Sequence, residues 1–414
     1  MNNYDGRDGG YNNENNFTNN KMGEAADAPP SSNPLAHISL KKLLQNDATE
    51  CQRLFAAVRD VGFFYLDLRD AELGEQALAD AESMFSVGRD FFYLPEEEKE
   101  KYDMNKFGGH FGYKGYLNRT LDVKEFYAVS KDDILSVPPP TPTTTDPGED
   151  SPLSYQKRIL QPTPITAARS LIASHIHNSH SIISILLGHL TQLLHLPSGT
   201  LEGVHRLHAR SGDQVRWIKI QANTTPTTPP STPAAEHIVL DEHCDSNSLT
   251  LLFNHSGGLQ VRIPRPQTRY DAGTSESDSL ADFDAGSEEP DDNRRDEAGA
   301  SRWVCAAPVP GHCAILVGEQ MANLLHGHLR SSVHRVCLPT PEPSTGSSTR
   351  YSLVYFCRLE DDVVLKQLAG MTVIPFAPEI LTDNDVLPQQ VHGKRSLLQW
   401  ARNKRLLGRS LDGK

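Results

Sequence analysis

Short runs of β-branched, leucine-rich and aromatic residues fill the second half of the chain. They occupy positions 215–220, 249–253, 259–263, 303–307, 312–317, 333–338 and 351–356. Runs of this length, bounded by glycine, proline or polar residues, are typical of β-strands. A series of short strands with helices before and after it predicts an α+β protein that is mainly β. The expected architecture is a double-stranded β-helix (jelly roll) core with an N-terminal helical layer.

Helical spacing is commoner in the first 200 residues. Apolar positions around Cys51 predict a helix, and the run 62–68 predicts a strand. A long amphipathic helix should follow, with Asp70 as its N-cap. The apolar spacing from 165 to 194 predicts a long scaffold helix. Four histidines are scattered around that helix, which fits packing or solvent positions better than a metal site.

These patterns divide the chain into five expected parts. They are an Asn-rich disordered tail (1–33), an N-terminal segment (34–160) with a Pro/Thr loop (134–153), the scaffold helix (161–203), the jelly-roll core (204–380) and a C-terminal helix and tail (381–414). The core carries an acidic insert at 264–302 with 11 Asp and Glu against 5 Arg. Its few apolar residues follow neither strand nor helix spacing, so we expect a disordered excursion from a β-hairpin.

Composition narrows the choice of partners and compartment. The net charge is -13 and hydrophobic residues make up 37% of the 414 residues. An acidic chain is a poor match for nucleic acids or anionic membranes, which reward clustered Lys and Arg. The six cysteines show no Cys-x-x-Cys spacing, and there is neither a signal-peptide pattern nor a long apolar run. We therefore expect a cytoplasmic protein with reduced thiols.

The stretch 237–253 carries the strongest chemical signal. On a strand, residues two apart project from one face, so His243 and Asp245 are expected to point together. A second histidine, His334, stands on a later predicted strand that a jelly roll can bring opposite. Two imidazoles and one carboxylate form the facial triad of non-haem Fe(II) oxygenases, which leaves coordination positions open for substrate and oxygen. The pattern predicts an iron site.

A second pair of polar residues lies on the last predicted strand. Arg350 and Ser352 again stand two apart, so a guanidinium and a hydroxyl should converge on one spot. A guanidinium fork matches a carboxylate, which is what a small dicarboxylate cosubstrate offers. Because its neighbours are apolar, we expect Arg350 to be half buried and to need an anionic partner.

Several motifs together resemble a known family. They are His243-x-Asp245, Leu249-Thr250, Gly258-Leu259-Gln260-Val261, Trp303-Val304, His334-Arg335-Val336, Arg350-x-Ser352 and, earlier, Gly62-Phe-Phe-Tyr65, Pro95-Glu-Glu-Glu-Lys99 and Asp122-x-x-Glu125. In type, order and spacing this set is similar to the isopenicillin N synthase-like group of 2-oxoglutarate and Fe(II)-dependent dioxygenases.

The resemblance implies a function and roles for five residues. Iron would be bound by His243, Asp245 and His334, and the distal carboxylate of 2-oxoglutarate by Arg350 and Ser352. With O2, the enzyme would hydroxylate or desaturate a small-molecule metabolite while 2-oxoglutarate is decarboxylated to succinate. The resemblance does not identify the substrate or the oligomeric state.

The sequence departs from the family pattern at three places. Ile220-Gln221-Ala222 stands where members often carry Tyr-Pro, which removes a hydroxyl near the cosubstrate. A Gly318-Glu319 pair replaces Gly-Asp, a change that should be tolerated, and the normally short hairpin between Val261 and Trp303 carries the insert. Arg335 is expected to brace its strand.

Two other functions fit the same residues. An oxygen-dependent, ring-closing oxidase could use the Arg350 fork for a substrate carboxylate, without 2-oxoglutarate. A catalytically silent, cupin-like binding protein is the non-enzymatic alternative, and loss of one metal ligand would be its simplest signature. None of the three is lost.

Overall fold

The strands of the predicted core form two sheets. The computed structural model describes residues 34–107, 110–117, 122–138, 161–222, 238–264, 301–337 and 349–363. One sheet has eight strands in the order β1-β2-β10-β7-β12-β5-β4-β3, and the other has four in the order β6-β11-β8-β9. The strands are β1 (His37–Ser39), β2 (Phe63–Asp67), β3 (Gly112–Leu117), β4 (Asp122–Ser130), β5 (Gln214–Ala222), β6 (Ile238–His243), β7 (Leu249–Asn254), β8 (Leu259–Pro264), β9 (Ser301–Cys305), β10 (His312–Val317), β11 (His334–Cys337) and β12 (Thr349–Cys357).

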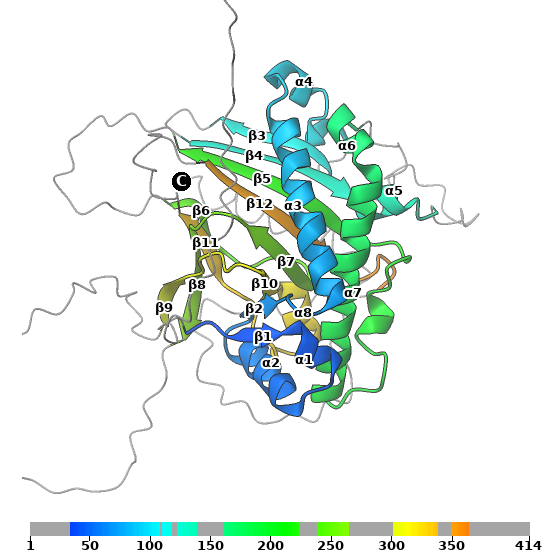
Figure 1. Ribbon diagram of the computed structural model, residues 1–414, viewed down its shortest axis with the longest axis vertical. Helices are drawn as coiled ribbons and strands as arrows, with labels where there is room; N and C mark the ends of the chain where they lie inside the picture. Colours follow the sequence, from blue (N-terminus) through cyan, green and yellow to red (C-terminus); the bar gives the residue numbers. More distant parts are fainter. Residues whose placement is uncertain are drawn as a thin grey trace, which may run out of the picture. The chain divides into compact units, whose positions relative to one another are not determined.

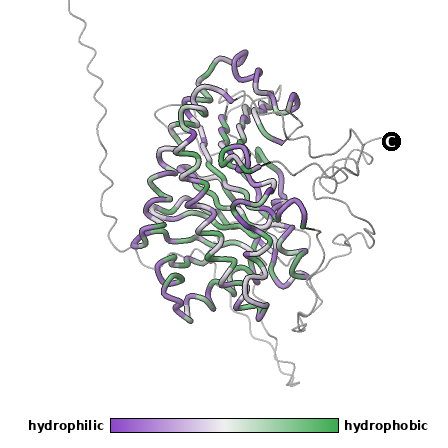
Figure 2. The backbone as a smooth tube through the Cα atoms, turned by 90° about the vertical axis from the view of Figure 1, so that its right-hand side faces the viewer, coloured by the Kyte–Doolittle hydropathy of each residue, from purple (hydrophilic) through white to green (hydrophobic). Residues whose placement is uncertain are grey.

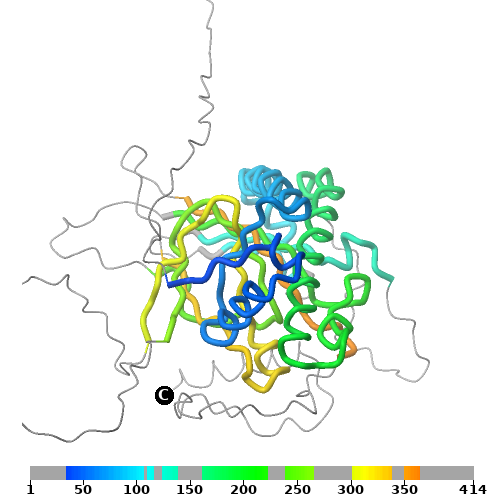
Figure 3. The backbone as a smooth tube through the Cα atoms, turned by 60° about the horizontal axis from the view of Figure 1, so that its bottom comes forward, coloured from blue at the N-terminus to red at the C-terminus, as the bar shows by residue number. Residues whose placement is uncertain are grey.

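Helices cover the face of the larger sheet that points away from the smaller one (Figure 1). They are α1 (Leu40–Leu44), α2 (Ala48–Asp60), α3 (Glu72–Phe92), α4 (Glu96–Glu100), α5 (Lys131–Leu135), α6 (Thr163–Ala167), α7 (Arg169–Leu193) and α8 (Glu319–Leu324), with 3-10 turns η1 (Met104–Phe107) and η2 (Glu202–Val204). Figure 3 shows α7 and the smaller sheet on opposite sides of the larger sheet. The predicted double-sheet core with an N-terminal helical layer is confirmed.

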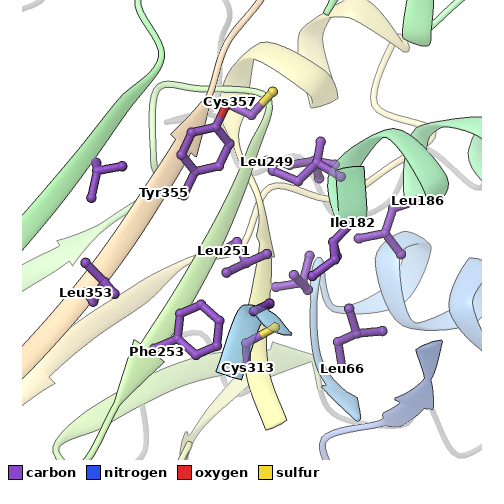
Figure 4. Close-up of a cluster of buried hydrophobic side chains, with 14 of the residues drawn as sticks. Leu66, Ile182, Leu186, Leu249, Leu251, Phe253, Cys313, Leu353, Tyr355 and Cys357 are labelled. Carbon is purple, nitrogen blue, oxygen red and sulfur yellow. The ribbon is translucent and has the colours of Figure 1, made fainter. Parts of the chain in front are cut away.

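Alternation along the central strands separates two apolar clusters. Leu251 of β7 and Leu353 of β12 face the helices, in the same apolar cluster as Ile182 of α7 (Figure 4). The residues at the alternate positions of each strand, including Leu252 and Val354, face the smaller sheet and pack in the second cluster. Figure 2 shows hydrophobic positions concentrated along the inner strands, with hydrophilic positions on the outer helical surface. Each central strand therefore presents every second side chain to the space between the sheets.

Two local predictions need correction. Asp70 does not cap α3, because the helix starts at Glu72 and the N-cap position is Ala71, which makes no side-chain cap hydrogen bond. Asp70 instead adopts the left-handed conformation, with φ of 59°, and this places its carboxylate outside the cap position. The scaffold helix expected from 165 to 194 is divided at Ala168 into α6 and the longer α7.

Several sequence predictions lie outside the described residues. They concern the tail 1–33, most of the loop 134–153, positions 265–300 of the acidic insert and the C-terminal helix and tail expected at 381–414. The two ends of the insert are described. β8 and β9 pair in antiparallel register, with Pro264 opposite Ser301 and Arg262 opposite Trp303, so the insert leaves and rejoins the sheet at adjacent positions. Within the described ranges, the helices are too short or too polar to cross a bilayer.

Candidate metal centre

Two histidines from neighbouring strands meet at one end of the smaller sheet. His243 is the last residue of β6 and His334 the first of β11, and the two are direct partners in the antiparallel pairing. Their ring centroids are 4.3 Å apart. Residues opposite each other in an antiparallel pair project to the same side, so both imidazoles face the space between the sheets. His243 and His334 are 91 positions apart in the sequence (334 minus 243), and the pairing of β6 with β11 brings them together.

Asp245 completes the group, although not for the reason that alternation predicts. β6 ends at His243, so Asp245 lies in the connection to β7 instead of on the strand. Its Oδ1 atom is 3.9 Å from His243 Nε2 and 3.8 Å from His334 Nε2. One ligand atom from each of the three residues lies within 4.8 Å of the others. The carboxylate is brought there by the loop, and the i, i+2 spacing alone does not explain its position.

Backbone contacts orient both imidazoles. His243 Nδ1 lies 2.9 Å from the carbonyl oxygen of Asp241, and His334 Nδ1 lies 3.0 Å from that of Ser332. A carbonyl can only accept, so each Nδ1 must carry the proton and each Nε2 presents its lone pair toward Asp245 Oδ1. Metal-binding histidines usually donate their second ring N–H in this way. The tautomers and the donor set therefore fit a divalent iron.

Burial favours the neutral form that a metal requires. Removal from solvent, together with the neighbouring His334, lowers the pKa of His243 below its usual value. The side chains of Asp245 and His334 are 12% and 8% exposed, and that of His243 is 34% exposed. The open side of the group therefore lies at His243.

Hydrogen bonds hold Asp245 from behind. Its Oδ2 accepts from the hydroxyl of Thr250 at 2.5 Å, and Asn247 Nδ2 donates to the Thr250 oxygen at 2.9 Å. The backbone N–H of Glu319 donates to the Asp245 carbonyl at 2.7 Å. Because Oδ2 is held, Oδ1 is the oxygen left for a metal. The contact that Glu319 makes with Asp245 comes from its backbone, so it does not depend on the length of the Glu319 side chain.

The glycine before Glu319 is required by a close approach. A Cβ atom on Gly318 would lie 2.0 Å from the carbonyl oxygen of Asn247. No side chain fits there without moving the loop that carries Asp245. The Gly318-Glu319 turn thus shapes the loop.

Arg350 is more deeply buried than its sequence context suggested. It is 3% exposed, and its Nε donates to the Gly257 carbonyl at 3.0 Å while Nη1 donates to the Ser352 hydroxyl. Both partners are neutral, and no carboxylate among the described residues forms an ion pair with it. Burial lowers its pKa to about 10. The expectation of a half-buried arginine is therefore wrong, because Arg350 is fully buried beside the Gly257-Gly258 turn; that it needs an anionic partner stays a prediction.

Arg350 and Ser352 face the same interior as the metal-binding candidates. Arg350 lies opposite Ile220 on β5, a member of the apolar cluster between the sheets. Ile220 lies in turn opposite Lys124 on β4. The apolar cluster that contains Ile220 also contains Val261, which lies directly opposite His334. A buried guanidinium and a three-ligand centre thus occupy one space between the two sheets.

A second group of possible ligands is better explained as a hydrogen-bonded part of the core. His180 of α7 lies near Asp213 and Cys357, and all three are buried. The oxygens of Asp213 already accept from the Tyr355 hydroxyl at 2.9 Å and the Arg358 N–H at 2.7 Å. Burial raises the pKa of the Cys357 thiol well above its usual value, which disfavours the thiolate that binds metals. The predicted packing role for the histidines of this helix holds for His180.

Comparisons with known proteins agree with this arrangement. Residues 34–151 match the N-terminal model of non-haem dioxygenases in morphine synthesis, and residues 288–359 match the 2OG-Fe(II) oxygenase superfamily. A 2-oxoglutarate-dependent dioxygenase of Aspergillus fumigatus is 28% identical over 82% of this chain and 79% of its own. The gloE dioxygenase of Glarea lozoyensis is 27% identical over 83% of this chain and 84% of its own.

The chain is a non-haem Fe(II) and 2-oxoglutarate-dependent dioxygenase that is similar to the isopenicillin N synthase-like type.

Solved structures show the same fold. A full-length Neurospora crassa protein in complex with alpha-KG superposes with a TM-score of 0.59 and 15% identity, covering 92% of this chain and 98% of that one. A 2OG-Fe(II) oxygenase family protein from Caulobacter crescentus gives a TM-score of 0.58 with 19% identity, covering 90% of this chain and 100% of that one. The dioxygenase uses Fe(II), 2-oxoglutarate and O2 to oxidise a small-molecule substrate, by hydroxylation or desaturation.

Two polar residues on the inner faces of the strands were not singled out by sequence reasoning. Thr250 was noted only as part of a family motif, and Lys124 was passed over between Asp122 and Glu125. Thr250 is the one polar residue in the run 249–253, and Lys124 shares the inner face of its strand with Phe126. In both cases the available signal was a polar side chain at a position where alternation predicts an apolar one.

Proposed function

We propose that this dioxygenase binds Fe(II) through His243, Asp245 and His334 and holds the distal carboxylate of 2-oxoglutarate through Arg350 and Ser352. One observation carries the iron assignment. Two imidazoles, both with their Nδ1 protons committed to backbone carbonyls, direct Nε2 at the same carboxylate oxygen. Among the described residues, no hydrogen-bond donor uses the lone pairs of these two Nε2 atoms, which leaves them for a metal.

The cosubstrate assignment rests on the charge balance at Arg350. A fully buried guanidinium with neutral partners is costly, and a bound carboxylate would offset that cost with charge-assisted hydrogen bonds. Ser352 would add its hydroxyl to the same group. This need for an anion supports a cosubstrate role for Arg350.

The protein residues would work mainly by positioning. The chemistry supplied by bound iron, 2-oxoglutarate and O2 is the oxidation of an unactivated C–H bond, with 2-oxoglutarate converted to succinate and CO2. Thr250 would keep Asp245 in one orientation, and Arg350 would fix one end of the cosubstrate. The apolar residues between the sheets would exclude water from the reacting groups. The partly exposed side of His243 leaves room for substrate entry.

We further propose that the partners are small molecules, without nucleic acid or membrane, and that the dioxygenase acts in the cytoplasm. The acidic net charge of -13 supports the first point. The ring-closing alternative and the silent binding protein are less well supported, because the relatives that match most of the chain are named 2-oxoglutarate-dependent dioxygenases.

Binding and turnover measurements test the proposal. Purified protein should bind one Fe(II) per chain under anaerobic conditions, and His243→Ala should lose that binding while keeping its melting temperature. Arg350→Met should retain the metal but bind 2-oxoglutarate about 10- to 100-fold more weakly. Undiminished turnover in His243→Ala would refute the iron assignment. Substrate oxidation at full rate without 2-oxoglutarate would favour the ring-closing alternative.

A further inference from the structure

A chain of buried hydrogen bonds ends at the loop that carries Asp245. This metal loop, residues 244–248, connects β6 to β7, and its last residue, Ser248, is completely buried. The Ser248 hydroxyl oxygen lies 2.7 Å from His205 Nε2 and 2.8 Å from Gln320 Oε1. His205 directly follows η2 and Gln320 belongs to α8, and each is 2% exposed. Three polar side chains from separate segments therefore meet at the end of the metal loop.

The partners of His205 determine where its protons lie. Nδ1 is 2.7 Å from the carbonyl oxygen of Leu201, which can only accept, so Nδ1 carries a proton. Burial lowers the pKa of His205, although the Leu201 carbonyl and nearby carboxylates act in the opposite direction. The neutral ring is thus favoured, and its Nε2 has a lone pair for the Ser248 hydroxyl. His205 links Ser248 to the backbone of the segment before β5.

The Ser248 hydroxyl has one proton to donate. Gln320 Oε1 already accepts from the backbone N–H of Leu359 at 2.9 Å. Among the described residues, His205 Nε2 has Ser248 as its hydrogen-bond partner. Donation to His205 therefore satisfies a buried acceptor that would otherwise have no donor, which is the more costly omission.

Backbone contacts connect Ser248 to Asp245. The N–H groups of residues 318–320 donate to the carbonyls of Ser248, Asp245 and Asn247, at 3.0, 2.7 and 3.1 Å. The metal loop is therefore fastened along its length to the start of α8. The bond to His205 adds a side-chain contact at the end of the loop, on a segment that α8 does not provide. A shift of Ser248 would move the backbone that carries the iron-binding carboxylate.

Other buried histidines contact different parts of the protein. His180 Nδ1 lies 3.2 Å from the Tyr355 hydroxyl, and His189 Nε2 lies 3.0 Å from the Leu43 carbonyl oxygen. Both belong to α7, on the helical side of the larger sheet. His205 differs from them because its second nitrogen is bonded to the metal loop.

We propose that His205 is a positioning residue for the metal centre: it holds the Ser248 end of the metal loop and thereby fixes the Asp245 carboxylate for Fe(II). The inference rests on the proposed role of Asp245 as an iron ligand. His205 acts through Ser248 and is not itself a ligand. It gives the segment before β5 a part in a site whose ligands come from later strands and the metal loop.

The test is anaerobic Fe(II) binding to the full-length metal-free protein, by competition with a chromogenic chelator, with thermal melts of the same samples. An asparagine amide can replace Nδ1 of His205, and a glutamine amide can replace Nε2. His205→Asn should keep the Leu201 contact, lose the Ser248 contact and bind Fe(II) about 3- to 10-fold more weakly, the range of one neutral hydrogen bond. His205→Gln should keep the Ser248 contact and bind Fe(II) within about twofold of wild type.

Ser248→Ala removes the same contact from the loop side. It should weaken Fe(II) binding at least as much as His205→Asn, and it supplies the measurement should His205→Asn not fold. The double variant should bind Fe(II) no more weakly than Ser248→Ala alone, because both changes remove one shared contact. His189→Asn is the matched control for a buried histidine bonded to a carbonyl. It should lower the melting temperature and leave the Fe(II) affinity within about twofold of wild type.

The outcomes separate this inference from the proposed function. Equal Fe(II) affinities of His205→Asn and His205→Gln would overturn it, whatever their melting temperatures, because the Ser248 contact is what distinguishes the two variants. An equal loss of affinity in His205→Asn and His189→Asn would also overturn it, since general destabilisation would then explain both. If His243→Ala binds Fe(II) like wild type, the iron assignment itself fails. If His243→Ala loses iron but the Asn and Gln variants do not differ, only the role of His205 is refuted.

Discussion

Replacing Thr250 by valine should weaken metal binding without disturbing the fold. Thr250 is 2% exposed, and its hydroxyl lies 2.5 Å from Asp245 Oδ2. Valine has nearly the same shape, so the change removes the hydrogen bond to the Asp245 carboxylate and the one from Asn247 Nδ2, which keeps its bond to the Leu249 carbonyl. Without its bond to Thr250, the Asp245 carboxylate can rotate. Its Oδ1 atom, which faces both imidazoles, is then no longer held in one position.

The magnitude follows from the environment of Asp245. A hydrogen bond to a charged group contributes about 1.5–3 kcal/mol, or roughly 10- to 150-fold in affinity. Because the Asp245 side chain is 12% exposed, water can partly replace the hydroxyl, so we expect the lower part of this range, about 10- to 30-fold. Loss of an outer hydrogen bond to a metal ligand typically has an effect of this size.

Thr250→Ser is the matched control. It keeps the hydroxyl and loses one buried methyl group, which should lower the unfolding free energy by about 1 kcal/mol. Its metal affinity should stay within about threefold of wild type. The serine variant should thus be less stable but keep its metal affinity. The valine variant should lose more metal affinity than any change in its stability explains.

The assay is anaerobic competition for Fe(II) with a chromogenic chelator, together with thermal melts of the metal-free proteins. Wild-type affinity in Thr250→Val would refute the positioning role. An equal loss of affinity in the serine and valine variants would show that packing at this position matters and that the hydroxyl does not.

Three other predictions concern pH, Lys124 and the insert. Fe(II) affinity should fall as the pH drops through the pKa of His243, which burial and the neighbouring His334 hold below the ordinary histidine value of about 6.5. An affinity that is constant down to about pH 5 in Fe(II) titrations would contradict this. For Lys124, the folded pKa of about 8 lies below the ordinary 10.5, so the unfolded chain binds more protons between these values. The stability of the apo protein should therefore rise with pH across that window, and pH-dependent melts of Lys124→Met should lack this rise. Replacing residues 265–300 by a short Gly-containing turn should keep the melting temperature and 2-oxoglutarate turnover, because β8 and β9 already pair up to Pro264 and Ser301. Lost turnover with metal binding retained would show that the insert takes part in catalysis, as a lid would.

Local periodicity accounts for most of the fold that could be predicted. The strands at 249–253, 312–317 and 351–356 are recognisable because β-branched and aromatic side chains suit a pleated, half-buried surface. The grouping of His243, Asp245 and His334 could also be predicted from the sequence, because two histidines and one carboxylate are a known set of iron ligands. Both rest on properties of a residue and its near neighbours.

Local patterns were less reliable at the ends of elements. β6 stops at His243, so the strand rule paired it with Asp245, which does lie close to it, for an incomplete reason. The expected cap at Asp70 was displaced because that residue takes a left-handed turn before α3. End positions depend on where the chain must go next, which a pattern within one element does not contain.

The tertiary structure alone decided which distant residues share one face of the larger sheet. Lys124 and Arg350 are 226 positions apart (350 minus 124), and they share a row only because β5 pairs with β4 on one side and β12 on the other. A register shift of one residue would turn each of these side chains to the opposite face. The sequence determines the identity and alternation of the polar residues. Their convergence depends on strand pairing between remote segments, which no local pattern encodes.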